Sequence, residues 1–94
     1  MRITFADVAE HFEGILAGRV SRDQADRWAA HVCDMLDNGT LEFFPAADEP
    51  RIWAGVGYLH GIDIPNPENN EFLYSDDDVR WAFEKIVNGH PLTR

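Results

Sequence analysis

The segment from residue 72 to residue 89, FLYSDDDVRWAFEKIVNG, constrains the fold more than any other part of the chain. Ser75 occupies an expected helix N-cap position, and Asp78 follows at the spacing of a capping box. The carboxylates of residues 76–78 fall on the first turn, where free backbone N–H groups and the helix dipole favour negative charge. Asn88-Gly89 is a typical helix end. These features predict a helix over residues 75–89.

An apolar stripe runs along this helix, and one tryptophan lies outside it. The stripe residues recur at helical spacing; they are Val79, Ala82, Phe83, Ile86 and Val87. Trp81 projects roughly 160–200° away from the centre of the stripe, at 100° per residue. An acidic helix start beside an off-face tryptophan is the strongest functional signal in the sequence, and it suggests a binding surface.

Three further helix starts carry capping or proline signals; they are Thr4 with Asp7, Ser21 with Gln24, and Asp48-Glu49-Pro50. We therefore expect helices over residues 4–18, 21–38 and 50–61. The third is the weakest prediction, because Gly55 and Gly57 each cost about 1 kcal/mol in a helix interior. Either these glycines allow close helix packing, or they mark an irregular segment used in binding. The expected core consists of Phe12, Leu16, Trp28, Val32, Leu36, Val56, Phe83 and Ile86.

The connections between helices are harder to assign. Residues 40–47 are either a short extended piece or an apolar tether, whereas the prolines and asparagines of residues 63–71 indicate a loop. Residues 72–74 could form an extended segment that pairs with residues 42–44. The predicted fold class is all-α, a small four-helix domain with a short two-stranded β contact, and a single domain spans residues 1–94.

The net charge of −9 limits the classes of molecule that the chain is expected to bind. Nucleic acids and anionic lipid surfaces call for basic patches, so neither is expected as a partner. The single cysteine, Cys33, excludes an internal disulfide. The first residues show no signal peptide, and no apolar run approaches the ~20 residues that span a bilayer. We expect a cytoplasmic protein.

Metal binding and catalysis find little support in the sequence. The four histidines, His11, His31, His60 and His90, fall on different expected elements and form no H-x-x-x-H pair. There is no phosphate-binding glycine loop and no nucleophile with an adjacent base. His60 is better explained as a helix-end residue than as an acid–base catalyst. We therefore predict no metal, no cofactor and no enzymatic activity.

Acidic and aromatic residues gather around the loop before the last helix. Six acids occur between residues 63 and 78 without an intervening Lys or Arg; they are Asp63, Glu68, Glu71, Asp76, Asp77 and Asp78. Nearby aromatics are Trp53, Tyr58, Phe72, Tyr74 and Trp81. Carboxylates provide steering and specificity at interfaces, and Trp and Tyr provide buried anchors. The competing interpretation is structural, with acids stabilising the helix start and aromatics fixing the loop to the core.

One pattern resembles a known class of small acidic bacterial proteins. It comprises Ser21-Arg22-Asp23 with Trp28, then Trp53, Leu59 and Gly61, then Tyr74 before Val79-Arg80-Trp81. Proteins with this pattern are similar in size and charge to immunity proteins, which neutralise toxins of neighbouring cells. Colicin-type immunity proteins are short, acidic and four-helical, with an acidic, tyrosine-bearing face toward a basic nuclease. This chain differs from them in having a lone Tyr58 in the third helix instead of a tyrosine pair.

The leading functional hypothesis is a non-enzymatic module that binds a basic partner protein, such as a toxin. Its expected contact residues are Trp53, Tyr58, Asp63, Glu68, Glu71, Asp76, Asp77, Asp78 and Trp81. The alternative is a structural or regulatory subunit that forms a homodimer through Trp81 and the last helix.

Overall fold

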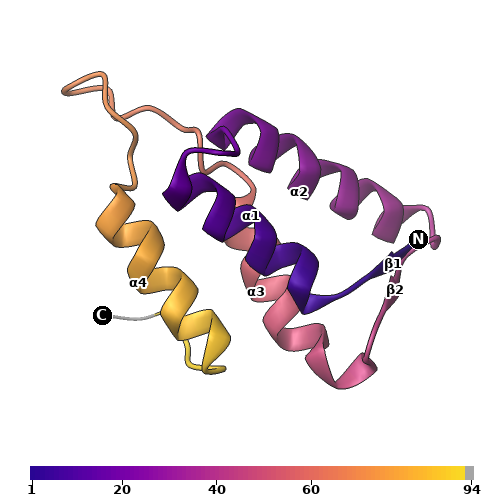
Figure 1. Ribbon diagram of the computed structural model, residues 1–94. Coiled ribbons are helices and arrows are strands. Elements are labelled where there is room, and N and C mark those ends of the chain that lie inside the picture. The colour runs from indigo at the N-terminus through magenta and orange to yellow at the C-terminus, as the bar shows by residue number, and fades with distance from the viewer. Residues whose placement is uncertain (93–94) are drawn as a thin grey trace.

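The computed structural model describes residues 1–92, and within them the chain forms four helices and two short strands (Figure 1). The elements in chain order are β1 (Arg2–Ile3), α1 (Phe5–Ala17), α2 (Arg22–Asp37), β2 (Glu42–Phe43), a 3₁₀ turn (Ala46–Asp48), α3 (Glu49–Leu59) and α4 (Asp76–Val87). The predicted fold class is confirmed. Each helix begins and ends within two residues of its expected bounds.

Capping explains where three of these helices begin. Complete capping boxes are present at the starts of α1, α2 and α4, formed by Thr4 with Asp7, Ser21 with Gln24, and Ser75 with Asp78. In each box the hydroxyl accepts from one backbone N–H and the partner side chain accepts from another, so two otherwise unsatisfied donors are paired. Gly18 ends α1 in the left-handed conformation at φ 77°, which a glycine adopts without strain.

Helix α1 packs against α3 and α4, and α2 packs against α3. Phe12 is fully buried among these helices. Gly55 of α3 lies so close to α1 that a Cβ atom there would overlap Val8 Cγ1. The close-packing interpretation is therefore confirmed for Gly55. Gly57 is exposed, and a Cβ there would meet no atom within 4 Å.

The core differs from the expected one at the helix ends. Leu36 was a wrong core prediction, because it is 45% exposed on the last turn of α2, and Val87 is 41% exposed at the end of α4. At these positions the helical stripe continues while the neighbouring helices no longer cover it. Phe12, Val32, Val56 and Ile86 are buried as expected. Leu16, Trp28 and Phe83 are half-buried and pack against that core.

The predicted pairing of residues 42–44 with residues 72–74 is wrong. Strand β2 pairs in parallel with β1, in the register Arg2 with Glu42 and Ile3 with Phe43. Glu42 N–H donates to Met1 O at 2.8 Å, and Phe44 N–H donates to Ile3 O at 2.9 Å. The strands lie at one end of the molecule, and residues 72–74 lie at the other (Figure 1).

None of the helices within residues 1–92 combines the length and hydropathy that crossing a bilayer requires.

Candidate functional site

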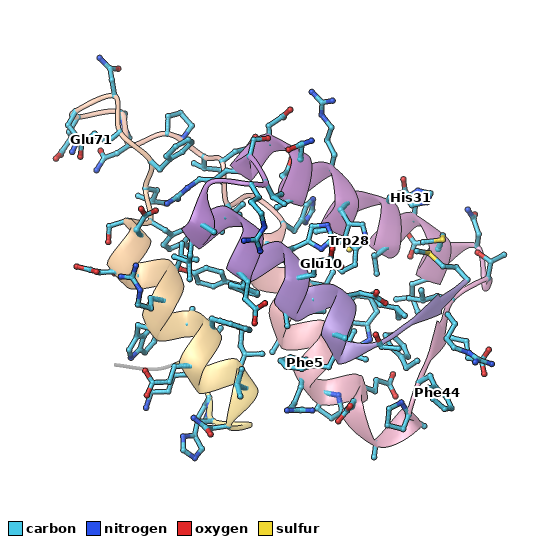
Figure 2. The ribbon with its side chains drawn as sticks, viewed as in Figure 1. Phe5, Glu10, Trp28, His31, Phe44 and Glu71 are labelled. Atoms are coloured by element: carbon cyan, nitrogen blue, oxygen red, sulfur yellow. The ribbon has the colours of Figure 1, made fainter. Side chains whose placement is uncertain are left out.

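The acidic loop, defined here as residues 63–74, folds back on itself before α4. Leu73 N–H donates to Ile64 O at 2.9 Å, and Asn66 N–H donates to Glu71 O at 2.6 Å. Asn70, at the turn, has φ 60°, a left-handed conformation that asparagine tolerates. The loop projects beyond the helices, with Glu71 in the projecting part (Figures 1 and 2). This segment is therefore an ordered hairpin-like structure held by backbone bonds.

Arg22 at the start of α2 fixes this loop to the helices. Its side chain is only 8% exposed and lies on the same helix face as the buried residues Ala25 and Ala29. Nη1 donates to Tyr74 O at 2.6 Å and to Ile62 O at 3.4 Å. The guanidinium thereby joins the backbone at both ends of the acidic loop.

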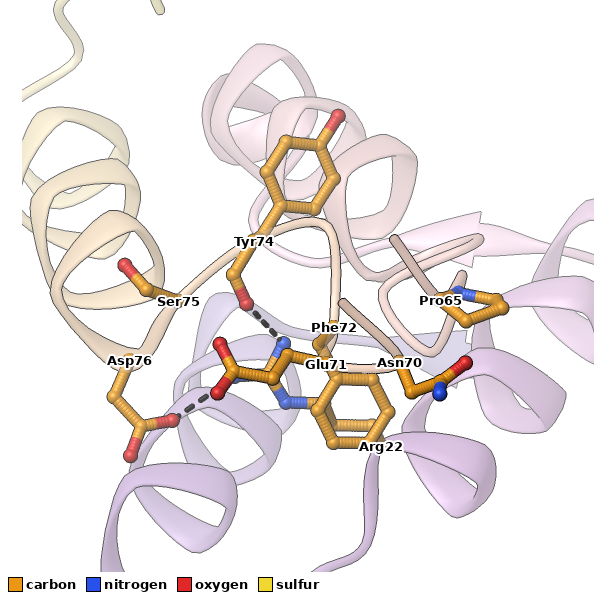
Figure 3. Close-up of a pocket in the computed structure, with 8 residues that line it drawn as sticks. All are labelled: Arg22, Pro65, Asn70, Glu71, Phe72, Tyr74, Ser75 and Asp76. Atoms are coloured by element: carbon orange, nitrogen blue, oxygen red, sulfur yellow. Dashed lines mark hydrogen bonds and ion pairs between the residues drawn. The ribbon is translucent and has the colours of Figure 1, made fainter. Parts of the chain in front are cut away.

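Two further contacts complete the surroundings of Arg22. Nη2 lies 2.9 Å from Asp76 Oδ1, and the guanidinium carbon lies 4.3 Å from the centre of the Phe72 ring. Figure 3 shows the guanidinium between these groups, beside a pocket of about 420 Å³ that Glu71 also lines. Because charge-assisted hydrogen bonds and an aromatic face surround the cation, its burial is compensated.

The acidic loop exposes apolar side chains as well as carboxylates. Ile64, Phe72, Leu73 and Tyr74 are 50%, 49%, 47% and 36% exposed. Glu68 and Glu71, on the same loop, are also exposed. Large apolar groups clustered within one short surface segment are typical of an interaction site.

A second pocket, of about 380 Å³, lies where the loop meets α3 and α4. It is lined by Tyr58, Leu73, Tyr74, Asp78 and Trp81. Tyr58 and Tyr74 lie with their ring centres 5.1 Å apart. We call this the aromatic pocket. Tyr74 lines both pockets: its backbone carbonyl faces Arg22 and its ring faces Tyr58.

The structure brings together most of the expected contact residues. Tyr58, Asp78 and Trp81 line the aromatic pocket, while Glu71 and Asp76 line the pocket at Arg22. Asp63 and Glu68 lie on the acidic loop. Asp77 forms an exposed ion pair with Arg80 at 2.8 Å, and Asp78 accepts from Ser75 N–H in the capping box at 3.0 Å.

Trp53 lies apart from this group. Its ring packs edge-on against Phe43 of β2, with ring centres 5.5 Å apart. It therefore packs in the region around the strands, away from the acidic loop.

Sequence reasoning missed Arg22, Ile64 and Leu73 as parts of the site. Arg22 entered only as part of a helix-start motif, although it shares helical spacing with Ala25 and Ala29. A charged residue on an otherwise apolar face is a signal for a buried ion pair. Its ion-pair partner, Asp76, is 54 residues away in the sequence, so sequence spacing alone could not identify this pair.

The histidines and the cysteine lie outside this surface. His60 is the C-cap residue of α3, and His11 stacks on Trp28 with ring centres 4.0 Å apart. Within residues 1–92, no three His, Cys, Asp or Glu side chains are grouped to hold a metal ion. The pKa of the Cys33 thiol is raised by burial and, to a lesser extent, by Asp37 and Asp34.

Comparisons with known proteins identify no relative: no family model, no curated protein and no solved structure matches this chain.

Proposed function

We propose that this chain is a non-enzymatic protein-binding module of the immunity or inhibitor type, which covers a basic surface of a partner protein. The acidic loop and the start of α4 form the contact surface. The observation that carries the proposal is the exposure of Ile64, Phe72, Leu73 and Tyr74 within one carboxylate-rich segment. Burial of these side chains against a partner would remove apolar surface from water, at roughly 25 cal/mol per Å².

The distribution of charge supports a basic partner. The chain carries 17 acidic and 8 basic residues. On the proposed surface Arg22 and Arg80 are each paired with a carboxylate, whereas Glu68 and Glu71 are exposed on the loop. The surface thus combines exposed apolar side chains with carboxylates, and specific interfaces use both kinds of group. The carboxylates would steer the partner during encounter and select against acidic competitors.

The test is affinity capture with the immobilised protein, from a lysate of its own cells and from a panel of purified basic nucleases and toxins, at low and high salt. We expect a basic protein to be retained at low ionic strength and released or weakened at high ionic strength. Glu68→Gln with Glu71→Gln removes two loop charges. Glu10→Gln with Glu13→Gln removes the same number of charges from the exposed side of α1, and serves as the matched control.

Loss of capture with the loop variant alone would support the proposal. Equal loss with both variants would show a non-specific charge effect and contradict it. Size measurement of the pure protein separates this function from the homodimer alternative, since a dimer in the absence of any partner, abolished by Trp81→Ala, would support the alternative instead.

A further inference from the structure

The aromatic pocket is built from three separated parts of the chain. Tyr58 comes from α3, and Leu73 and Tyr74 come from the end of the acidic loop. Asp78 and Trp81 are three residues apart on α4, so their side chains lie on neighbouring positions of one helix surface. Three aromatic rings, one aliphatic side chain and one carboxylate therefore share a pocket of about 380 Å³.

A series of rings connects this pocket to the core. Phe83 stacks on Phe12 with ring centres 4.9 Å apart, Phe12 stacks on Tyr58 at 5.9 Å, and Tyr58 contacts Tyr74 at 5.1 Å. Phe12 is fully buried, whereas Tyr74 is at the surface. The backbone of Tyr74 is also held by Arg22. Tyr58 and Tyr74 are therefore held in the pocket by contacts that continue into the core.

The chemistry of these walls favours a cation with a flat shape. Aromatic faces carry negative electrostatic potential and attract cations within about 6 Å of the ring centre. A carboxylate adds charge and hydrogen-bond acceptors. The guanidinium of arginine is planar, stacks on rings and is weakly hydrated, so it fits this combination better than the compact ammonium of lysine.

Within residues 1–92, Arg22 and Arg51 both lie in such surroundings. Arg22 lies 4.3 Å from the centre of the Phe72 ring and 2.9 Å from Asp76. Arg51 lies 4.2 Å from the centre of the Phe5 ring and 2.9 Å from Asp48. In both places a guanidinium contacts an aromatic ring and a carboxylate, and the aromatic pocket presents the same two kinds of group at the surface.

We propose that the aromatic pocket binds the guanidinium group of an arginine side chain exposed on the partner protein. The proposal rests on the proposed function and specifies the chemistry of its partner. The guanidinium lies against the rings of Tyr58, Tyr74 and Trp81, and Leu73 contacts the methylene stem. Asp78 supplies the negative charge that complements the cation.

The test uses the full chain and three capped tripeptides that differ only in the central residue: arginine, lysine or citrulline. Citrulline has nearly the shape of arginine without its charge. We monitor the tryptophan indole N–H signals by NMR, with the Trp81 signal assigned from its absence in Trp81→Leu. The arginine peptide should shift the Trp81 signal in a saturable way, with affinity about tenfold or more above that for citrulline.

Two variants with a matched control locate the binding. Trp81→Leu and Tyr74→Leu should each weaken binding of the arginine peptide about tenfold. Binding to Trp81→Leu is measured on the backbone amide signals of residues 73–78, and binding to Tyr74→Leu on the indole signal of Trp81. Tyr74→Leu leaves the backbone carbonyl that Arg22 uses in place, so this variant keeps the loop attachment if Trp81→Leu impairs folding. Trp53→Leu, which removes a ring outside the pocket, should leave the affinity unchanged.

Equal shifts from arginine and citrulline, or no saturable shift from arginine, would overturn the arginine site. Capture of the basic partner then separates the two proposals. If the partner still binds the Tyr74→Leu and Trp81→Leu variants but is lost from the Glu68→Gln, Glu71→Gln variant, the arginine site is wrong and the proposed function stands. If the arginine peptide binds and no basic protein is captured from either source, the pocket stands and the proposed function fails.

Discussion

Arg22 is the single side chain on which the geometry of the candidate surface depends most. Burying a guanidinium is unfavourable unless its donors are paired. Here two carbonyls and one carboxylate accept its N–H groups, and the Phe72 ring covers one face. Since Ile62 directly precedes the acidic loop and Tyr74 is its last residue, the same contacts that compensate the charge also position the loop.

Arg22→Met should therefore lower the free energy of unfolding by about 2–3 kcal/mol, because hydrogen bonds to a charged group are lost and their carbonyl acceptors are left unpaired. The measurement is urea unfolding monitored by circular dichroism. Arg27→Met is the control: its ion pair with Asp23 lies on the surface of the same helix, with Arg27 76% exposed, and should contribute less than about 0.5 kcal/mol. Similar decreases in the free energy of unfolding for both variants would show that the contacts of Arg22 stabilise the protein no more than a surface ion pair does.

Cys33 provides a prediction on pH. The pKa of its thiol is raised first by burial, then by Asp37 and Asp34. A thiol is neutral when protonated, so a raised pKa keeps it unreactive to a higher pH than a free thiol. The rate of alkylation by iodoacetamide should rise with pH throughout the range below the pKa and level off only above pH 9, because the pKa lies above the ordinary value of 9.0.

Replacing Asp37 or Asp34 with Asn should increase the alkylation rate of Cys33 at pH 8, because removal of a nearby negative charge lowers the pKa of the thiol. Asp34→Asn should increase the rate less than Asp37→Asn, because Asp34 raises the pKa of the thiol less than Asp37 does. Asp23→Asn, on the first turn of the same helix, is the control and should leave the rate unchanged. Unaltered rates in all three variants would contradict the electrostatic contribution.

At the scale of the elements, helix starts were predictable because their signals are local. Each capping box involves residues three apart, such as Ser75 and Asp78, and both partners are visible in one short stretch of sequence. The pairing partner of a strand, by contrast, has no local signal in the sequence. Glu42 and Phe43 pair with the first residues of the chain, and neither spacing nor composition identifies a partner 40 residues distant.

The helix crossing at Gly55 gives a second stability prediction. Gly55→Ala should lower the free energy of unfolding by about 1–3 kcal/mol, since the added methyl group would overlap Val8 Cγ1 and force α1 and α3 apart. Gly57→Ala, two residues along the same helix and open to solvent, should instead raise it by about 0.5–1 kcal/mol. Thermal and urea unfolding of the two variants measure both changes.

Val8→Ala combined with Gly55→Ala should recover part of the loss, because the smaller side chain makes room for the new methyl group. A stabilising Gly55→Ala variant would contradict the close approach of the two helices.

At the scale of the whole molecule, the net charge of −9 should govern how fast a basic partner arrives. For the captured partner, the association rate constant should fall by about tenfold or more as ionic strength rises from about 0.01 M to about 1 M, because the screening length shrinks from about 30 Å to about 3 Å. Stopped-flow or surface-based kinetics measure this dependence. The dissociation rate constant should change much less.

The charge variants distinguish local steering from the overall field. Glu68→Gln with Glu71→Gln should reduce the salt dependence of the association rate constant more than Glu10→Gln with Glu13→Gln does, although each double variant removes two negative charges. If the association rate constants of the two double variants depend equally on ionic strength, only the net charge of the protein matters. The charges of the acidic loop then have no particular effect on association.

The attachment of the acidic loop by Arg22 also determines what binding costs in entropy. A loop that became ordered only on contact would lose conformational freedom worth about 1–2 kcal/mol for each residue fixed, and this loss would reduce the affinity. In this chain the loop backbone is ordered in the free protein by Arg22 and its own hydrogen bonds. Recognition can then proceed as the docking of a preformed surface, in which most of the ordering has already been completed by folding.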